Sequence, residues 1–151
     1  WITMQSKYPV HSYISYSLAT AHRRIHTSLT KRLKEFGVQV EAWRVMEILE
    51  SEPELTMSEL AEVVLMHPPT LTKLVDRMVS DGIVHRRIAS QDHRQVNLAL
   101  TELGRKRIHQ IREQVQIEDD AIFQKIGSEK AELLHNLLAE IGEIDIPRQT
   151  N

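Results

Sequence analysis

Hydrophobic residues recur at helical spacing through most of the chain. An apolar stripe with steps of three or four residues runs from Ile14 to Phe36 and predicts one long helix. Gly37 follows at the position where a left-handed residue commonly ends a helix. A second helix is expected before the break at Glu52 and Pro53. Its apolar face consists of Ala42, Val45, Met46 and Leu49.

Two shorter helices follow in the middle of the chain. Thr56 and Glu59 form a capping-box sequence, which predicts a short helix that buries Leu60, Ala61 and Val64. Pro68 and Pro69 fit the first turn of the next helix, and Gly82 marks its end. The buried face of that helix is expected to be Leu71, Leu74, Val75 and Met78.

The pattern then changes from helical to alternating. Residues 83–88 and 94–100 predict two strands, and residues 89–93 join them as a hairpin. The second strand alternates Val96, Leu98 and Leu100 with Gln95, Asn97 and Ala99, which is typical of a strand with one buried face. Thr101 offers a hydroxyl where the strand stops, which suits the start of another helix.

Helical spacing returns from about Glu102 to Lys125, and Gly127 and Ser128 separate it from a last helix. The apolar face of that helix consists of Leu133, Leu134, Leu137, Leu138, Ile141 and Ile144. The long first helix and the last two helices carry more apolar surface than one small domain can cover. We therefore expect a homodimer, with a larger monomeric core as the alternative.

The order of elements predicts a mostly α fold with a small β-hairpin wing. Two short helices joined by a tight turn and followed by a hairpin form a winged helix-turn-helix core. Residues 38–100 are assigned to this DNA-binding domain, residues 1–37 to the N-terminal helix of a dimerisation region, and residues 101–151 to its C-terminal helices.

The second helix of such a core enters the major groove, with its N-terminal residues toward base edges. We therefore predict a DNA-binding surface made of His67, Pro68, Pro69, Thr70, Thr72, Lys73 and Arg77. Arg77 is expected near a phosphate and the other residues near bases. The alternative is an ordinary amphipathic helix whose polar face is only solvated.

The hairpin carries a second candidate surface. Arg94 at its tip is expected to enter the minor groove, where the negative potential is concentrated. Asp92 would orient the Arg94 guanidinium by charge-assisted hydrogen bonds. The wing residues predicted to bind DNA are Arg86, Arg87, Asp92, His93 and Arg94. The alternative is an exposed ion pair among ordinary strand-edge charges.

The distribution of charge supports a nucleic-acid partner although the net charge of the 151 residues is −2. Residues 67–107 contain eight Lys and Arg residues and four Asp and Glu residues, so this segment is +4 and the remainder is −6. Positive charge gathered in one region is expected of a surface that binds phosphates. A chance cluster on a solvated face is the alternative.

Composition excludes several other functions. The chain has no Cys, which excludes disulfides, thiolate metal sites and thiol redox sensing, and favours a reducing compartment. No apolar run approaches the roughly 18 residues of a membrane span, so we expect a cytoplasmic protein without a membrane partner. There is no Gly-rich phosphate loop and no recognisable nucleophile–base spacing. We therefore expect no enzyme, no catalytic residue and no cofactor.

Several motifs stand out in and after the predicted helix-turn-helix: the "LVDRM" and "DGIV" runs, the Asp-x-Arg of the wing tip, and the "LALTELG" exit into a long helix. Together they resemble the MarR family of transcription regulators. The segment "VQVEAWRVMEILE" is similar to the second helix of the family. The resemblance implies a homodimer on a pseudo-palindromic operator, wing arginines in the minor groove, and a small, often aromatic, ligand that releases DNA. The absent thiol sets the chain apart from oxidation-sensing members.

We accordingly predict a repressor that is released by a small aromatic or phenolic effector. The candidate effector pocket consists of Tyr13, Tyr16, His22, Trp43 and Met46, and core or interface roles are the alternative for these residues. We expect no metal site; the candidates for one are the four-apart pairs His22 with His26 and His109 with Glu113. The alternative functions are a metal-responsive regulator and a winged-helix protein-interaction module without DNA binding.

Overall fold

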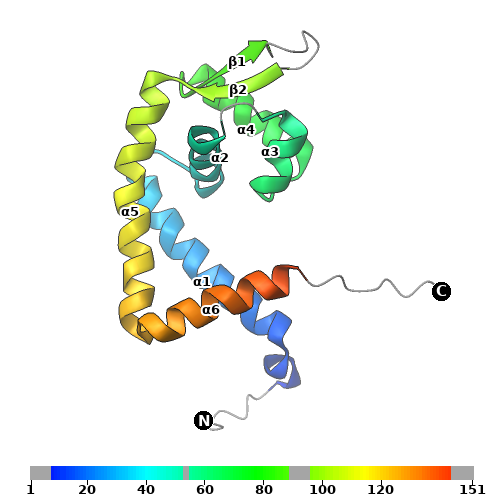
Figure 1. Ribbon diagram of the computed structural model, residues 1–151, viewed down its shortest axis with the longest axis vertical. Coiled ribbons are helices and arrows are strands. Elements are labelled where there is room, and N and C mark those ends of the chain that lie inside the picture. The colour runs from blue at the N-terminus through cyan, green and yellow to red at the C-terminus, as the bar shows by residue number, and fades with distance from the viewer. Residues whose placement is uncertain (1–7, 53–54, 89–95, 144–151) are drawn as a thin grey trace, which may run out of the picture. The chain divides into compact units, whose positions relative to one another are not determined.

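The computed structural model describes residues 8–52, 55–88 and 96–143. Their elements, in chain order, are the 3-10 helix η1 (Pro9–Ser12), α1 (Ile14–Lys34), α2 (Val40–Ser51), α3 (Met57–Val63), α4 (Pro68–Ser80), β1 (Val84–Ile88), β2 (Val96–Leu100), α5 (Glu102–Ile126) and α6 (Ser128–Gly142) (Figure 1). The predicted fold class, mostly α with one small hairpin, is confirmed. The chain divides into two compact units, residues 1–114 and residues 115–151.

Helices of the first unit begin and end at the caps that the sequence predicts. Gly37 follows α1 with a φ of 68°, and Gly82 follows α4 with a φ of 72°. At the start of α3, the Thr56 hydroxyl accepts a hydrogen bond from the Glu59 amide (3.3 Å). The Glu59 carboxylate accepts one from the Thr56 amide (2.8 Å), which completes the capping box. Local sequence therefore sets these boundaries.

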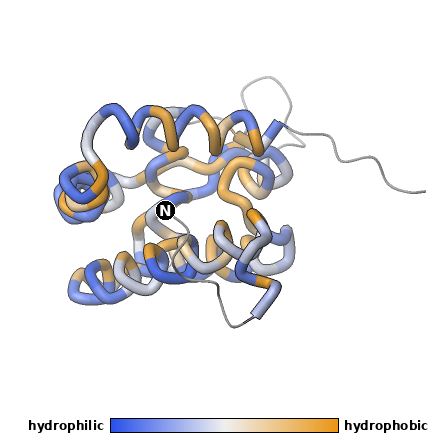
Figure 2. Tube along the Cα trace, turned by 90° about the horizontal axis from the view of Figure 1, so that it is seen from below, coloured by the Kyte–Doolittle hydropathy of each residue, from blue (hydrophilic) through white to orange (hydrophobic). Residues whose placement is uncertain are grey.

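The core of the first unit forms where α2, α3, α4 and the hairpin meet the end of α1 and the start of α5. Hydrophobic positions are spaced along the helices between hydrophilic ones (Figure 2), and α2, α3 and α4 each turn their apolar face inward. The largest fully buried side chains are Leu33, Val40, Val45, Met46, Leu49, Leu60, Val64, Leu71, Val75, Leu98, Ile108 and Ile111. Every predicted core position of α2, α3 and α4 is buried.

The hairpin pairs β1 with β2 antiparallel, with a register from Val84 opposite Leu100 to Ile88 opposite Val96. Leu98 and Leu100 are buried as expected. Ala99 belongs to the face predicted to be polar, yet it is only 4% exposed, because β2 contacts both α2 and α3. The predicted link and the predicted start of the second strand fall on residues 89–95, which lie outside the described residues.

The apolar stripe of α1 is covered only near its end. Leu29 and Leu33 are buried, whereas Ile14 and Ile25 are 70% and 43% exposed. A single chain therefore leaves the first half of this stripe in contact with solvent.

The second unit contains the end of α5 and the whole of α6. Gly127, with a φ of 85°, separates the two helices. Ala131 is the buried apolar residue of α6, while the remaining apolar face of that helix is 39–57% exposed. Its exposed members are Leu133, Leu134, Leu137, Leu138 and Ile141. Ile144, predicted on the same face, lies outside the described residues.

Candidate nucleic-acid interface

Helix α4 presents a polar face opposite its buried one. Its apolar residues point into the core, so the positions between them face solvent. All seven residues predicted to bind DNA from this helix and its N-cap are exposed: His67, Pro68, Pro69, Thr70, Thr72, Lys73 and Arg77. The fold thus places two cationic side chains and several small polar ones on one exposed surface.

The first turn of α4 is built by its prolines. Pro68 and Pro69 occupy the first two helical positions, where the amides that they lack would have had no partner within the helix. The His67 carbonyl accepts from the amides of Thr70 and Leu71, both at 3.0 Å. The Thr72 hydroxyl donates to the Pro68 carbonyl (3.0 Å) and keeps lone pairs for solvent or a ligand. The start of α4 therefore has few free backbone donors.

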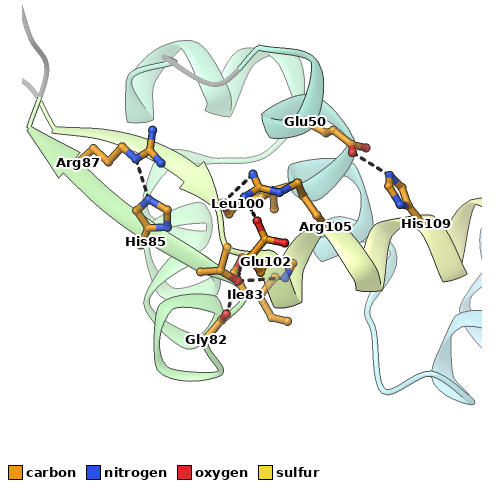
Figure 3. Close-up of polar contacts among 11 residues, drawn as sticks. Glu50, Gly82, Ile83, His85, Arg87, Leu100, Glu102, Arg105 and His109 are labelled. Atoms are coloured by element: carbon orange, nitrogen blue, oxygen red, sulfur yellow. Dashed lines mark hydrogen bonds and ion pairs between the residues drawn. The ribbon is translucent and has the colours of Figure 1, made fainter.

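The arginines of β1 are held by two neighbours. Arg86 forms an ion pair with Asp76 of α4, which ties the strand to the outer face of that helix. The Arg87 guanidinium donates to Nε2 of His85 at 2.7 Å (Figure 3). Both arginines are exposed, so their cationic groups remain accessible beside α4.

The predicted wing tip cannot be placed beside these residues. Asp92, His93 and Arg94 lie outside the described residues. The minor-groove role of Arg94 and the orienting role of Asp92 therefore stay predictions.

A polar junction joins the end of α4 to the start of α5. The Thr101 hydroxyl donates to the Gly82 carbonyl (2.5 Å) and accepts from the Gly104 amide (3.0 Å). This confirms the predicted capping role of Thr101. In the next turn the Arg105 guanidinium bonds the Glu102 carboxylate at 2.8 Å (Figure 3), and this hydrogen bond and charge lower the pKa of Glu102. The base of the hairpin is thereby anchored to α5.

An ionic cluster between α2 and α5 was not predicted. Arg112 contacts Glu47 at 2.8 Å and Glu50 at 2.6 Å, and His109 contacts Glu50 at 2.9 Å. The hydrogen bond to Glu47 and the two negative charges raise the pKa of Arg112. The sequence does contain a signal for this cluster, since two carboxylates three residues apart on α2 match two basic side chains three residues apart on α5. Sequence alone does not show that these two helices face each other.

The five candidate effector residues do not line one cavity. Met46 borders a cavity of 370 Å³ between α2, the end of α4 and the start of α5. Tyr16 borders a separate groove along α1. Tyr13 is 62% exposed, His22 is also exposed, and the Trp43 indole donates to Glu47 at 3.3 Å.

The cavity beside Met46 combines an apolar lining with two arginines. Its apolar side chains include Leu74, Met78 and Leu103, its cations are Arg77 and Arg107, and Asp81 adds one carboxylate. The Arg107 guanidinium donates to the Phe36 carbonyl at 3.0 Å. Because two arginines outnumber the one carboxylate of the lining, the cavity suits a small apolar ligand that carries an acidic group.

The metal candidates are not gathered into one site. The His22 and His26 rings lie 5.5 Å apart, and His26 lies 3.9 Å from Glu41. His109 is bonded to Glu50 instead of sharing a site with Glu113. Among the described residues, no group of three or more His, Asp or Glu side chains is placed to hold a metal ion.

Within the described residues, no helix is both long and apolar enough to span a membrane.

Comparison with known proteins gives consistent matches. The sequence model of the MarR family matches residues 39–96. The HTH-type transcriptional regulator FarR of Neisseria gonorrhoeae is 33% identical over 89% of this chain and 92% of its own length. The HTH-type transcriptional repressor IacR of Pseudomonas putida is 28% identical over 82% of this chain and 74% of its own length.

Solved structures agree with these matches. NadR in complex with 4-hydroxyphenylacetate has a TM-score of 0.77 and 33% identity over 93% of this chain and 98% of its own. The repressor CouR bound to a 23-mer DNA duplex has a TM-score of 0.83 at 20% identity, over 89% of this chain and 95% of its own, which supports the fold. The winged helix-turn-helix core, the exposed face of α4 and these relatives together identify the chain as a member of the MarR family of DNA-binding transcription regulators.

Proposed function

We propose that the protein is a repressor that binds a pseudo-palindromic operator as a homodimer and leaves it when a small aromatic acid binds. The observation that carries this proposal is the exposed face of α4, which joins Lys73 and Arg77 to small polar residues. In the proposed complex Thr70 and Lys73 contact base edges and Arg77 contacts a phosphate. Residues 38–100 are the proposed DNA-binding domain.

The wing extends this contact surface. Arg86 and Arg87 lie exposed on β1 and would neutralise backbone phosphates. From the sequence, Arg94 is proposed to enter the minor groove with Asp92 orienting it. Arginine suits this role because its planar guanidinium forms several hydrogen bonds at once.

Uncovered apolar surface supports the homodimer. The apolar face of α6 and the first half of the α1 stripe are exposed in one chain. A second copy is the simplest partner for such surfaces, because the same patches then cover each other. Residues 1–37 and 101–151 are the proposed dimerisation region. Two-fold symmetry would then set the two α4 helices about 34 Å apart, one turn of DNA.

Two relatives support an aromatic acid as the effector. NadR was solved with 4-hydroxyphenylacetate, and a relative from Escherichia coli, 25% identical over 93% of this chain, is the homoprotocatechuate degradative operon repressor. The 370 Å³ cavity beside Met46 is the proposed site, with Arg77 and Arg107 as partners for a carboxylate. Because Arg77 lies on α4, a ligand there would disturb the helix proposed to bind DNA.

The test is capture of sheared genomic DNA from the source organism, followed by sequencing of the retained fragments. Wild type should enrich an inverted repeat, and Lys73→Ala and Arg94→Ala should each weaken binding by roughly 1–3 kcal/mol. Lys130→Ala on α6 removes one exposed positive charge outside the proposed DNA-binding domain and should leave operator affinity unchanged. Repression is tested by a reporter behind the enriched sequence. Absence of any enriched sequence at moderate salt would reject the proposed function.

A further inference from the structure

One residue in the turn between α3 and α4 is unfavourable for folding in two respects. Leu65 has a φ of 61°, and every other positive φ in the described part of the chain belongs to a glycine. Leu65 is also 80% exposed, the highest value among the large hydrophobic residues that the structure describes.

The backbone conformation of Leu65 is imposed by the way α3 ends. The Met66 amide donates to the Ala61 carbonyl at 3.0 Å, and the Leu65 amide donates to the Glu62 carbonyl at 3.3 Å. This bonding pattern places Leu65 at the left-handed position after a helix, where glycine is favoured and a side chain with a Cβ is strained. The turn of a helix-turn-helix often contains glycine for the same reason.

Neither burial nor backbone preference explains a leucine at this position. A core leucine would be covered by neighbours, and a turn residue would be small or polar. A strained residue that also exposes an apolar side chain is an observation that points to a contact outside the chain. Val63, 50% exposed and two residues earlier, widens the apolar surface.

The position of Leu65 indicates what that contact is. Leu65 precedes the N-cap His67 by two residues, so the two Cα atoms lie within about 7 Å of each other. The N-terminal end of this helix is the part that faces base edges in a helix-turn-helix complex. The exposed Leu65 therefore lies close to the exposed start of α4, formed by His67, Pro68 and Pro69.

We propose that Leu65 makes an apolar contact with operator DNA at the edge of the major groove that α4 enters. The DNA surface that it meets is hydrocarbon, either a thymine C5-methyl group or the C–H face of a deoxyribose. This proposal rests on the proposed function, because it requires α4 to bind DNA. It adds a contact that carries no charge and, if the partner is thymine, discriminates between bases.

The test separates folding from binding at this one position. Leu65→Gly and Leu65→Asn both remove the apolar side chain and put a residue that tolerates positive φ in its place. Their melting temperatures should equal or exceed that of wild type, while their affinity for the operator should fall about fivefold. Leu65→Met keeps an apolar side chain and should retain most of the affinity. The operator is the repeat enriched from genomic DNA, and affinity is measured by fluorescence anisotropy.

Salt dependence gives a second readout. Leu65→Gly should leave the slope of log affinity against log salt unchanged because no phosphate contact is lost, whereas Arg77→Ala, which removes a proposed phosphate contact, should reduce the magnitude of the slope. An operator with deoxyuridine in place of thymine identifies the partner. If the penalty of Leu65→Gly disappears there, the contact is to a thymine methyl group. If the penalty persists, the contact is to deoxyribose.

The contact is overturned if Leu65→Gly binds the operator as tightly as wild type. In that case the proposed function stands without a contact from Leu65. If wild type itself retains no DNA, the proposed function fails and this contact fails with it. The two failures are distinguished by the wild-type measurement alone.

Discussion

At the scale of single residues, Arg107 has a specific role in the proposed effector site. Its guanidinium borders the cavity beside Met46 and is already oriented by the Phe36 carbonyl. Arg107→Gln should weaken binding of 4-hydroxyphenylacetate at least tenfold, because a charge-assisted hydrogen bond to the carboxylate is lost. Isothermal titration calorimetry of the protein measures this directly.

Arg105→Gln is the matched control for that experiment. Arg105 lies two residues earlier on α5 and bonds Glu102 outside the cavity. Loss of the Arg105 charge should leave the affinity for 4-hydroxyphenylacetate unchanged. The alcohol that corresponds to 4-hydroxyphenylacetate, with a hydroxyl in place of the carboxylate, should bind both variants and wild type equally weakly. Equal affinity of wild type and Arg107→Gln for the acid would place the effector site elsewhere.

Arg112 is the residue whose charge holds α5 to α2. Its side chain is 43% exposed, so solvent screens the pair, but it bonds two carboxylates at once. Arg112→Gln should lower the free energy of unfolding by about 1 kcal/mol, because Glu50 is then left with His109 as its remaining partner. Urea unfolding at fixed protein concentration measures the loss. Lys106→Gln, an exposed charge change on the same helix, should cost less, and an equal loss in both variants would contradict a specific role of the cluster.

At the scale of elements, the close approach of α5 to the strand start depends on Gly104. A Cβ at this residue would lie 2.3 Å from the Ile83 carbonyl oxygen, which already accepts the Thr101 amide at 3.0 Å. Gly104→Ala should therefore destabilise the fold by roughly 2–4 kcal/mol, as backbone must move. Gly142→Ala, with nothing within 4 Å of the new methyl group, should be neutral or slightly stabilising. Thermal unfolding of the two variants checks the contrast. Similar melting temperatures would show that the backbone between α5 and Ile83 shifts at little cost in stability.

The elements also show why part of the molecule was predictable from sequence. The capping box of Thr56 and Glu59, the glycines after α1 and α4, and the buried face of α4 are local patterns, and each was confirmed. The Arg112 cluster and the Arg86–Asp76 pair join residues that are far apart in sequence or on different elements. The left-handed Leu65 was missed because its neighbours resemble ordinary helix, and only the bonding of the turn reveals it.

At the scale of the whole molecule, charge is separated along the chain. Residues 14–34 of α1 contain five Lys and Arg residues and no Asp or Glu. Residues 115–143 contain seven Asp and Glu residues and two Lys residues. Opposite charges on the helices proposed to meet in the dimer would favour encounter of two copies, and apolar contacts would then hold them.

Dimerisation is therefore expected to depend on the apolar face of α6. Leu134 and Leu138 are four residues apart on one side of this helix, and each is 42% exposed in one chain. The double variant Leu134→Asp/Leu138→Asp should shift the protein from dimer to monomer in analytical ultracentrifugation, because two carboxylates cannot be buried there. Operator affinity should fall with it, since the second half-site is then no longer bound at a high effective concentration. Gln124→Glu with Asn136→Asp adds the same charge at exposed polar positions and should remain dimeric. If the leucine variant stays a dimer, the exposed face of α6 is not the interface, and the surface of α1 becomes the one to test.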